Sequence, residues 1–266
     1  MPEGDTIHRA ANRLGQALAG KPLVRFEAAR LAGSGPAPGT LIERVEARGK
    51  FLLVHFGDGS VLETHMKMAG SWHLYRPGER WRRSPSAARA VLATDDWVAV
   101  CFAAPHVVLR GATTVRRGTG LDRLGPDLTT ADPDLDVVVD RARRFSTNAT
   151  PVVDVLLDQR IFSGVGNVFK SEVLHACELH PDTPIGRLSD DLVRRLAEVA
   201  NAQLVAGVAG GPRTTVPGGV AVYGRAGRPC RSCGTLIEWA RRGPHARGTY
   251  WCPTCQPEPG RTTPDS

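Results

Sequence analysis

Residues 151–172 read PVVDVLLDQRIFSGVGNVFKSE and fix the architecture of the chain's second half. Apolar residues at helical spacing predict one helix that ends near Arg160 and a second helix that begins at Asn167. The linker contains Gly164 and Gly166, which favour a tight turn, so the pattern is a helix-turn-helix. Free N–H groups at the start of the second helix would form a phosphate site. An ordinary capped helix explains the same residues equally well.

Helical patterns also flank this motif. They are VVVDRARRF at 137–145, before it, and SDDLVRRLAEVANAQLVAGV at 189–208, after it. Both place apolar residues three or four positions apart, as on one face of a helix. We therefore expect residues 131–221 to form a helical domain.

The N-terminal part, to about Arg117, has a different pattern. An amphipathic helix is predicted over Asp5–Leu18. It is followed by short runs rich in β-branched and aromatic residues, with a GDG turn at 57–59, which predict antiparallel strands. We expect a β-sandwich or flattened barrel that, with the turn-rich segment after it, makes a domain of residues 1–130. The fold class is thus multi-domain α+β.

Cysteines mark a small third module. Four of the six follow the pattern Cys-x2-Cys-x18-Cys-x2-Cys: Cys230, Cys233, Cys252 and Cys255. This spacing is typical of a closed, structural four-cysteine zinc site. Two disulfides are the alternative, but no secretory signal is read and a large separate core needs no disulfides. We expect residues 222–256 to form a zinc finger with a β-hairpin over 236–252, and the tail 257–266 to fray.

Charge indicates the kind of partner. The formal net charge of +7 and the pI near 9.4 favour a polyanion. Seven arginines but only two acids lie between Val222 and Arg261, so the C-terminal segment is the basic pole. No apolar run approaches the length of a membrane span, and a reducing cytoplasm is the expected compartment.

The first residues offer a candidate nucleophile. Removal of Met1 would expose the secondary amine of Pro2, whose pKa near 8 leaves an appreciable unprotonated fraction at neutral pH. Such an amine can attack an electrophilic sugar carbon, and Glu3 could act as the general acid on the sugar oxygen. Taken alone, Met-Pro is a common start and an acid near a helix N-terminus merely suits the helix dipole.

Lysine is rare in this arginine-rich chain and occurs only at Lys21, Lys50, Lys67 and Lys170. A lysine in such a chain can mark a site that needs a titratable amine or a flexible point charge. Lys50 lies at a turn-to-strand junction, where site residues are often displayed, although a surface lysine is the simpler interpretation. Lys67 is flanked by two methionines, which fit either a core or an apolar wedge inserted between bases.

Several motifs together resemble a known family. They are PEGD at the N-terminus, RGK at 48–50, THMKMAG at 64–70, LGPDL at 124–128, LDQRIFSGVGNVFKSE, VYGRAGRPCRSCGTLIE and RGTYWCPTCQ, in family order. The chain is identified by them as a member of the formamidopyrimidine-DNA glycosylase and endonuclease VIII family, the helix-two-turn-helix glycosylases. The matches run from Pro2 to Gln256.

The resemblance implies roles for individual residues. Pro2 is the Schiff-base nucleophile, Glu3 the proton donor, and Lys50 the proton donor associated with β-elimination. Arg247, five residues before Cys252, matches the zinc-finger arginine linked to δ-elimination. The implied enzyme removes an oxidised base from DNA and then cuts the strand, with an extruded nucleotide held in a basic clamp.

The resemblance also assigns DNA contacts and shows departures. Lys67, Arg123 and Asn167 fall where endonuclease VIII-type members contact DNA, and Met68 resembles the wedge methionine of the purine-preferring branch. Thr6 stands where many members have a second glutamate. The opening PEGDT favours the endonuclease VIII branch and oxidised pyrimidines. The arginine-containing loop of the purine branch is not evident in CFAAPHVVLR at 101–110.

Two alternatives remain open at this point. One keeps the fold and mechanism with a preference for oxidised purines. The other is a non-catalytic zinc-containing DNA-binding protein, against which Pro2, Glu3 and Lys50 argue together. In each case we expect a monomer that carries one structural Zn²⁺ and binds damaged DNA as a duplex between its two main domains.

Overall fold

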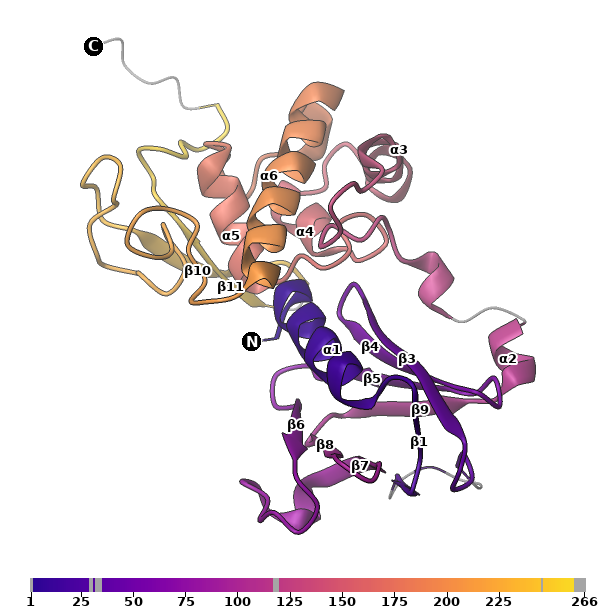
Figure 1. Ribbon diagram of the computed structural model, residues 1–266. Helices are drawn as coiled ribbons and strands as arrows, with labels where there is room; N and C mark the ends of the chain where they lie inside the picture. Colours follow the sequence, from indigo (N-terminus) through magenta and orange to yellow (C-terminus); the bar gives the residue numbers. More distant parts are fainter. Residues whose placement is uncertain (1, 29–30, 32–34, 117–119, 245, 261–266) are drawn as a thin grey trace. The chain divides into compact units, whose positions relative to one another are not determined.

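The computed structural model describes residues 2–28, 31, 35–116, 120–244 and 246–260. The chain divides into two compact units, labelled by their elements in Figure 1. The first contains residues 1–2 and 6–122, and the second contains residues 3–5 and 123–266. The three residues after Pro2 thus belong to the second unit. No helix in the described ranges is long and apolar enough to cross a membrane.

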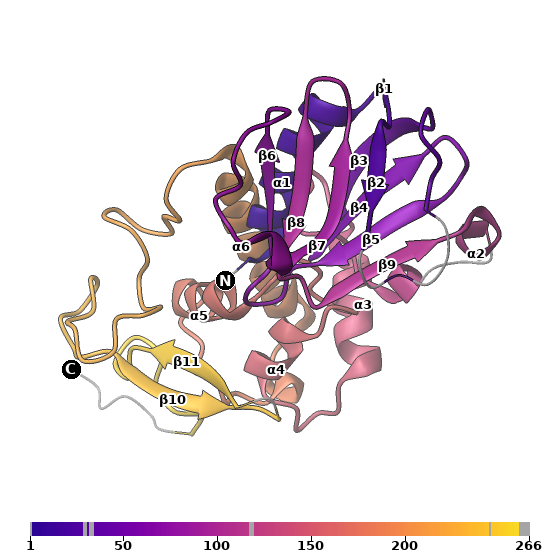
Figure 2. The ribbon, with the colours of Figure 1, turned by 90° about the horizontal axis from the view of Figure 1, so that it is seen from below.

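The first unit is a β-sandwich with one long helix (Figure 2). Its main elements are α1 (Gly4–Leu18), β1 (Lys21–Pro22), β2 (Arg25–Glu27), β3 (Leu41–Arg48), β4 (Phe51–Phe56), β5 (Val61–His65), β6 (Ser71–Tyr75), β7 (Ala88–Ala93), β8 (Val98–Phe102), β9 (His106–Arg110) and α2 (Ala112–Arg116). One antiparallel sheet has the order β1-β3-β4-β5-β9 and the other has the order β2-β7-β8-β6.

The two sheets and α1 share one apolar core. Ile7, Leu14 and Leu18, spaced at helical intervals, pack with the inner faces of both sheets. The outer face of the four-stranded sheet carries a second cluster, which we call the outer cluster: Tyr75, Val91, Ala93, Val98, Val100 and Phe102. Trp81, from the segment between β6 and β7, packs against it. Because alternate residues of a strand face opposite sides of the sheet, the same strands contribute side chains to both clusters.

The predicted sandwich and N-terminal helix are confirmed, but strand β9 and helix α2 are among the elements that were missed. Strand β9 lies at a sheet edge, and all five of its residues are half-buried. Its sequence therefore lacks the alternation of apolar and polar residues by which a strand is predicted. The five-residue helix α2 is too short to show a helical period.

The second unit is helical and ends in a β-hairpin. Its main elements are α3 (Leu135–Phe145), α4 (Val152–Leu157), α5 (Asn167–Ala176), α6 (Asp190–Ala209), β10 (Glu238–Arg242) and β11 (Arg247–Trp251). The four helices share a single core with the turn between α4 and α5. The hairpin pairs Glu238 with Trp251 and Arg242 with Arg247, so the predicted hairpin is confirmed.

The connection between α4 and α5 begins earlier than expected. Helix α4 ends at Leu157 rather than near Arg160, because the Asp158 side chain accepts the Arg160 backbone N–H (2.9 Å) and favours a turn. Gly164 then adopts φ 97°, a left-handed conformation that glycine tolerates best. Helix α5 begins at Asn167, as predicted.

Candidate functional site

Glu3 caps helix α5. Its side chain is fully buried, and its carboxylate accepts backbone N–H groups from Gly166 (3.1 Å), Val168 (2.7 Å) and Phe169 (3.3 Å). These donors belong to the first turn of α5, where N–H groups have no partner within the helix. The donors and the helix dipole together stabilise negative charge on Glu3.

This arrangement corrects the phosphate-site interpretation of the helix-turn-helix. The N–H groups at the start of α5 are bound to a carboxylate of the chain itself. Gly166 makes the close approach feasible, because a Cβ at this position would lie 2.3 Å from the Glu3 Cδ atom. The second glycine of the turn is therefore required by Glu3.

The residues after Glu3 are fixed to the same unit. Gly4 donates its N–H to the Gly164 carbonyl (3.0 Å). The buried Asp5 carboxylate accepts two hydrogen bonds from the Arg213 guanidinium (2.6 and 2.8 Å), a bidentate pair. Arg213 was missed in the sequence, where it is a lone arginine in a Gly/Pro-rich link. Pro2 is thus joined directly to a rigid anchor.

Lys50, Lys67 and Met68 lie on turns of the first unit. Lys50 is half-buried and follows Gly49 (φ 57°) in the turn between β3 and β4. Lys67 has φ 47° in the turn between β5 and β6. The two methionines differ in burial: Met66 is a core residue at 3% exposure, whereas Met68 is 65% exposed.

His65, not singled out in the sequence, is associated with both lysines. Its Nδ1 accepts the Lys67 backbone N–H (3.0 Å). Burial, followed by the charges of Lys67, Lys50 and His106, lowers the pKa of His65 to about 4. The ring is therefore neutral at physiological pH, and the turns that carry Lys50 and Lys67 lie near the same side chain.

Asn167 and Arg123 have different surroundings. Asn167 is 8% exposed, and its Nδ2 donates to the Gly248 carbonyl of the hairpin (3.0 Å), next to Arg247. Its Oδ1 is buried without a partner among the described residues. Arg123 has an exposed side chain at the end of a short 3-10 helix.

Lys170 of the second unit is a lysine in an unexpectedly buried position. It is fully buried in α5, and its Nζ donates to Thr249 Oγ1 of β11 (2.8 Å). Burial lowers its pKa to about 8; the charges of Asp154 and Glu3 oppose this shift, and the charge of Arg247 adds to it. A titratable amine therefore joins α5 to the hairpin between Glu3 and Arg247.

Replacing Lys170 by Met is expected to remove a pH-dependent part of the stability. The folded pKa is about 8, and the unfolded pKa is about 10.4, so between these values only the unfolded state holds the proton. The free energy of unfolding should rise with pH across this window in wild type. Urea titrations at several pH values would measure it. Lys21→Met, at a partly exposed lysine, is the control, and a pH-independent difference between wild type and Lys170→Met would contradict the assignment.

The four cysteines converge. Their Sγ atoms all lie within 4.8 Å of one another, and none is in a disulfide. Tetrahedral thiolates around a metal at about 2.3 Å would be separated by about 3.8 Å, so the cluster can hold an ion. Hydrogen bonds from Thr235 lower the pKa of Cys233 to about 6, which favours the metal-binding thiolate. His175 of α5 contacts Cys230 (Nε2 to Sγ, 3.6 Å).

The hairpin displays Arg247 beside a hollow of about 320 Å³. Its lining includes Asp154, Gln159 and Arg242. Arg242 forms an ion pair with Asp182 and lies over the Trp251 ring, 4.5 Å from its centroid. Arg247 itself is exposed. The hairpin thus uses Arg242 for packing and leaves Arg247 exposed.

Comparisons with known proteins cover nearly the whole chain. The N-terminal domain of formamidopyrimidine-DNA glycosylase matches residues 1–109, and its H2TH domain matches residues 124–217. The chain is 38% identical to the probable endonuclease 8 2 of Streptomyces coelicolor, covering 99% of this chain and 98% of that protein. It is 36% identical to the DNA-(apurinic or apyrimidinic site) lyase Nei2 of Mycolicibacterium smegmatis, covering 96% and 99%. The Lactococcus lactis formamidopyrimidine-DNA glycosylase has the same fold (TM-score 0.81, 21% identity, covering 97% and 100%).

Proposed function

We infer the function of this chain from its family. The chain belongs to the formamidopyrimidine-DNA glycosylase family, which includes the endonuclease 8 proteins. It is a DNA glycosylase with AP lyase activity that acts in base excision repair. The observation that carries the chemistry is the burial of Glu3 against α5, which fixes the residue next to Pro2.

In base removal, the Pro2 amine attacks C1′ of the damaged nucleotide and the base leaves. The nitrogen, positively charged after the attack, passes its proton to the Glu3 carboxylate, and its freed electron pair then forms the iminium with C1′ as the C1′–O4′ bond breaks. Glu3 protonates O4′ in this step. The three N–H groups of α5 hold Glu3 as a carboxylate before and after this step, so it can accept the proton of the nitrogen and pass it to O4′.

Strand cutting follows from the iminium. Its positive charge acidifies the C2′ hydrogen, and loss of that proton expels the 3′ phosphate. We assign the associated proton transfers to Lys50, on its turn between β3 and β4. Arg247, exposed on the hairpin, assists removal of the 5′ phosphate in a second elimination. Water then releases the sugar fragment and restores the Pro2 amine.

DNA binding involves further residues of both units. Lys67 and Arg123 contact phosphates, Met68 fills the space that the extruded nucleotide leaves, and Asn167 positions the hairpin next to Arg247. The four-cysteine cluster holds one Zn²⁺, which supplies structure and no chemistry. The protein acts as a monomer on duplex DNA in the bacterial cytoplasm, consistent with its bacterial relatives.

The preferred lesion is an oxidised pyrimidine. Support comes from the PEGDT opening and from the two relatives named endonuclease 8 and Nei2. Duplexes that each carry a single oxidised pyrimidine or purine, compared by the rate of base release, would rank the substrates. Faster release of oxidised purines would contradict this preference and leave the mechanism intact.

Replacing Glu3 by Gln separates the two activities. Without an acid at this position, base release should fall by about 10²–10⁴-fold. Cutting at a preformed abasic site should persist, because its open-chain aldehyde needs no ring protonation. Gel assays on a lesion duplex and an abasic duplex would measure both. Glu27→Gln, on exposed strand β2, is the control. Wild type without either activity would support a non-catalytic DNA-binding protein instead.

A further inference from the structure

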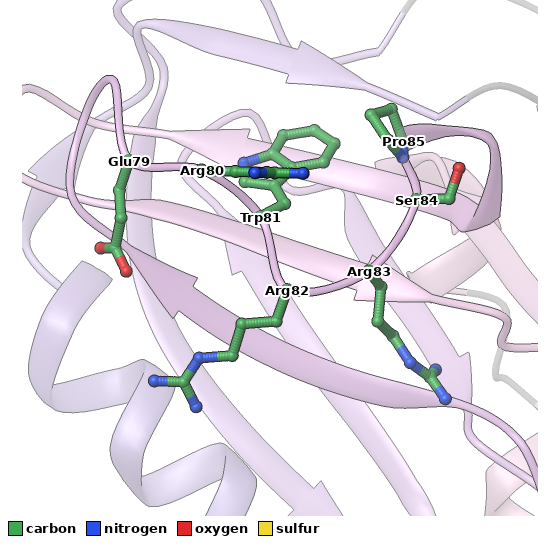
Figure 3. A pocket seen from close by; sticks show the side chains of 7 residues that line it. All are labelled: Glu79, Arg80, Trp81, Arg82, Arg83, Ser84 and Pro85. Atoms are coloured by element: carbon green, nitrogen blue, oxygen red, sulfur yellow. The ribbon is translucent and has the colours of Figure 1, made fainter.

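A basic segment of the first unit has no role in the chemistry above. Residues 79–85 read ERWRRSP and connect β6 to β7, and we call them the arginine strap (Figure 3). Arg80, Arg82 and Arg83 are exposed and line a hollow of about 500 Å³. Figure 3 shows the Arg82 and Arg83 side chains pointing away from the Trp81 ring.

The strap is held in place by Trp81 and by its backbone, and the Arg82 guanidinium takes no part in these contacts. Trp81 packs edge-to-face on Phe102 (5.7 Å between ring centroids) and stacks on Tyr75 (6.3 Å) in the outer cluster. The backbone N–H of Arg82 donates to the Tyr75 hydroxyl (3.1 Å). These contacts fix the backbone and the aromatic anchor, so the arginines are presented on an ordered segment and lose less entropy on binding.

Positive charge accumulates here. Five arginines and one acid, Glu79, lie between residues 76 and 90, and Glu79 accepts the Arg76 backbone N–H (2.9 Å). Across the described ranges, no ion pair involves Arg80, Arg82 or Arg83. Burial, followed by the charges of Arg83, Arg82 and Arg13, lowers the pKa of His73, as expected for a side chain near several cations.

The strap is continuous with the turn that carries Lys67 and Met68. The Arg83 guanidinium donates to the Ala69 carbonyl (3.1 Å) and to Ser71 Oγ (3.2 Å). Ala69 directly follows Met68, the exposed wedge candidate. A polyanion that contacts Lys67 would therefore meet Arg83, and Arg82 is the next residue of the strap.

We propose that the arginine strap binds the sugar–phosphate backbone of DNA next to the nucleotides that Met68 contacts. A guanidinium group can donate two parallel hydrogen bonds to the oxygens of one phosphate. Several such groups on one segment suit a strand that carries a charge at every phosphate. A protein partner fits less well, because protein interfaces need an apolar centre. The exposed large apolar residues in the described part of the chain, Val24, Leu41, Met68, Leu236 and Trp239, all lie outside the strap.

The proposal rests on the proposed function and can be tested separately from it. Arg82→Ala removes a guanidinium that makes no hydrogen bond or ion pair within the described residues, so the fold should be unaffected. We expect weaker binding to a duplex with a reduced abasic analogue, and a log–log salt slope that falls by about 1. Arg82→Glu should weaken binding further. Fluorescence anisotropy over a salt series measures both quantities.

The matched control is Arg25→Ala, which removes the same charge from β2 of the same sheet, where Arg25 pairs with Glu27 (3.4 Å). Its salt slope should equal that of wild type. If Arg82→Ala and Arg25→Ala give the same slope while wild type binds, the strap does not contact DNA and the proposed function stands. If wild type fails to bind any damaged duplex, the proposed function and the strap are both overturned.

Discussion

A protein that keeps one extra residue before Pro2, such as an uncleaved Met1, is expected to give no borohydride-trapped adduct with abasic DNA. The extension turns the Pro2 amine into an amide with no basic lone pair and no hydrogen on nitrogen, which cannot attack C1′. Binding should persist, because Arg123, Asn167 and Arg247 are unchanged. Trapping of extended and mature protein on one abasic oligonucleotide, with binding measured in parallel, would show the loss.

The control for this experiment is Lys50→Ala. It leaves the attacking amine in place, so an adduct should still form, more slowly. Mass spectrometry of the cross-linked peptide then identifies the nucleophile. An adduct at Lys50 or Lys67, or full trapping by the extended protein, would show that a lysine attacks and that the assignment of Pro2 is wrong.

Removal of the metal is expected to abolish DNA binding. The module's own apolar cluster is small, with Ala221, Val222 and Ile237 packed around Cys230 and Cys252. A structural zinc contributes on the order of 10 kcal/mol of folding free energy in comparable modules, far more than so small a cluster supplies. Without it, the hairpin that carries Arg247 should unfold and release its contacts to Asn167 and Lys170.

Chelation followed by elemental analysis and anisotropy would test this. Cys252→Ser should lose metal and binding together. The matched variant Cys177→Ser alters a half-buried thiol outside the cluster and should keep both. Undiminished affinity in metal-free protein would mean that the hairpin is held by its packing on α5 alone.

Sequence reasoning succeeded where the signal is local. The helix-turn-helix, the hairpin and the cysteine cluster each follow from spacing within a short segment, and all three are confirmed as structure. Strand β9 and helix α2 were missed because neither shows a period of its own. Met66 and Met68 looked alike in the sequence, and only the turn geometry buries one and exposes the other.

Long-range partners could not be predicted in the same way. The sequence shows that the N–H groups of α5 need an acceptor but not that Glu3, 163 residues before Gly166, supplies it. Lys170 was noted as a rare lysine, yet its burial against Thr249 depends on how the hairpin packs on α5. The arginine strap likewise depends on a tertiary feature, the outer cluster on which Trp81 is anchored.

The capping of α5 by Glu3 has a consequence for the order of events during synthesis. Val168, a partner of Glu3, is synthesised 165 residues after it. The segment that carries the proposed nucleophile must therefore wait, unanchored, while well over half of the chain is translated. The catalytic end of the chain can be fixed only after Phe169 has been made.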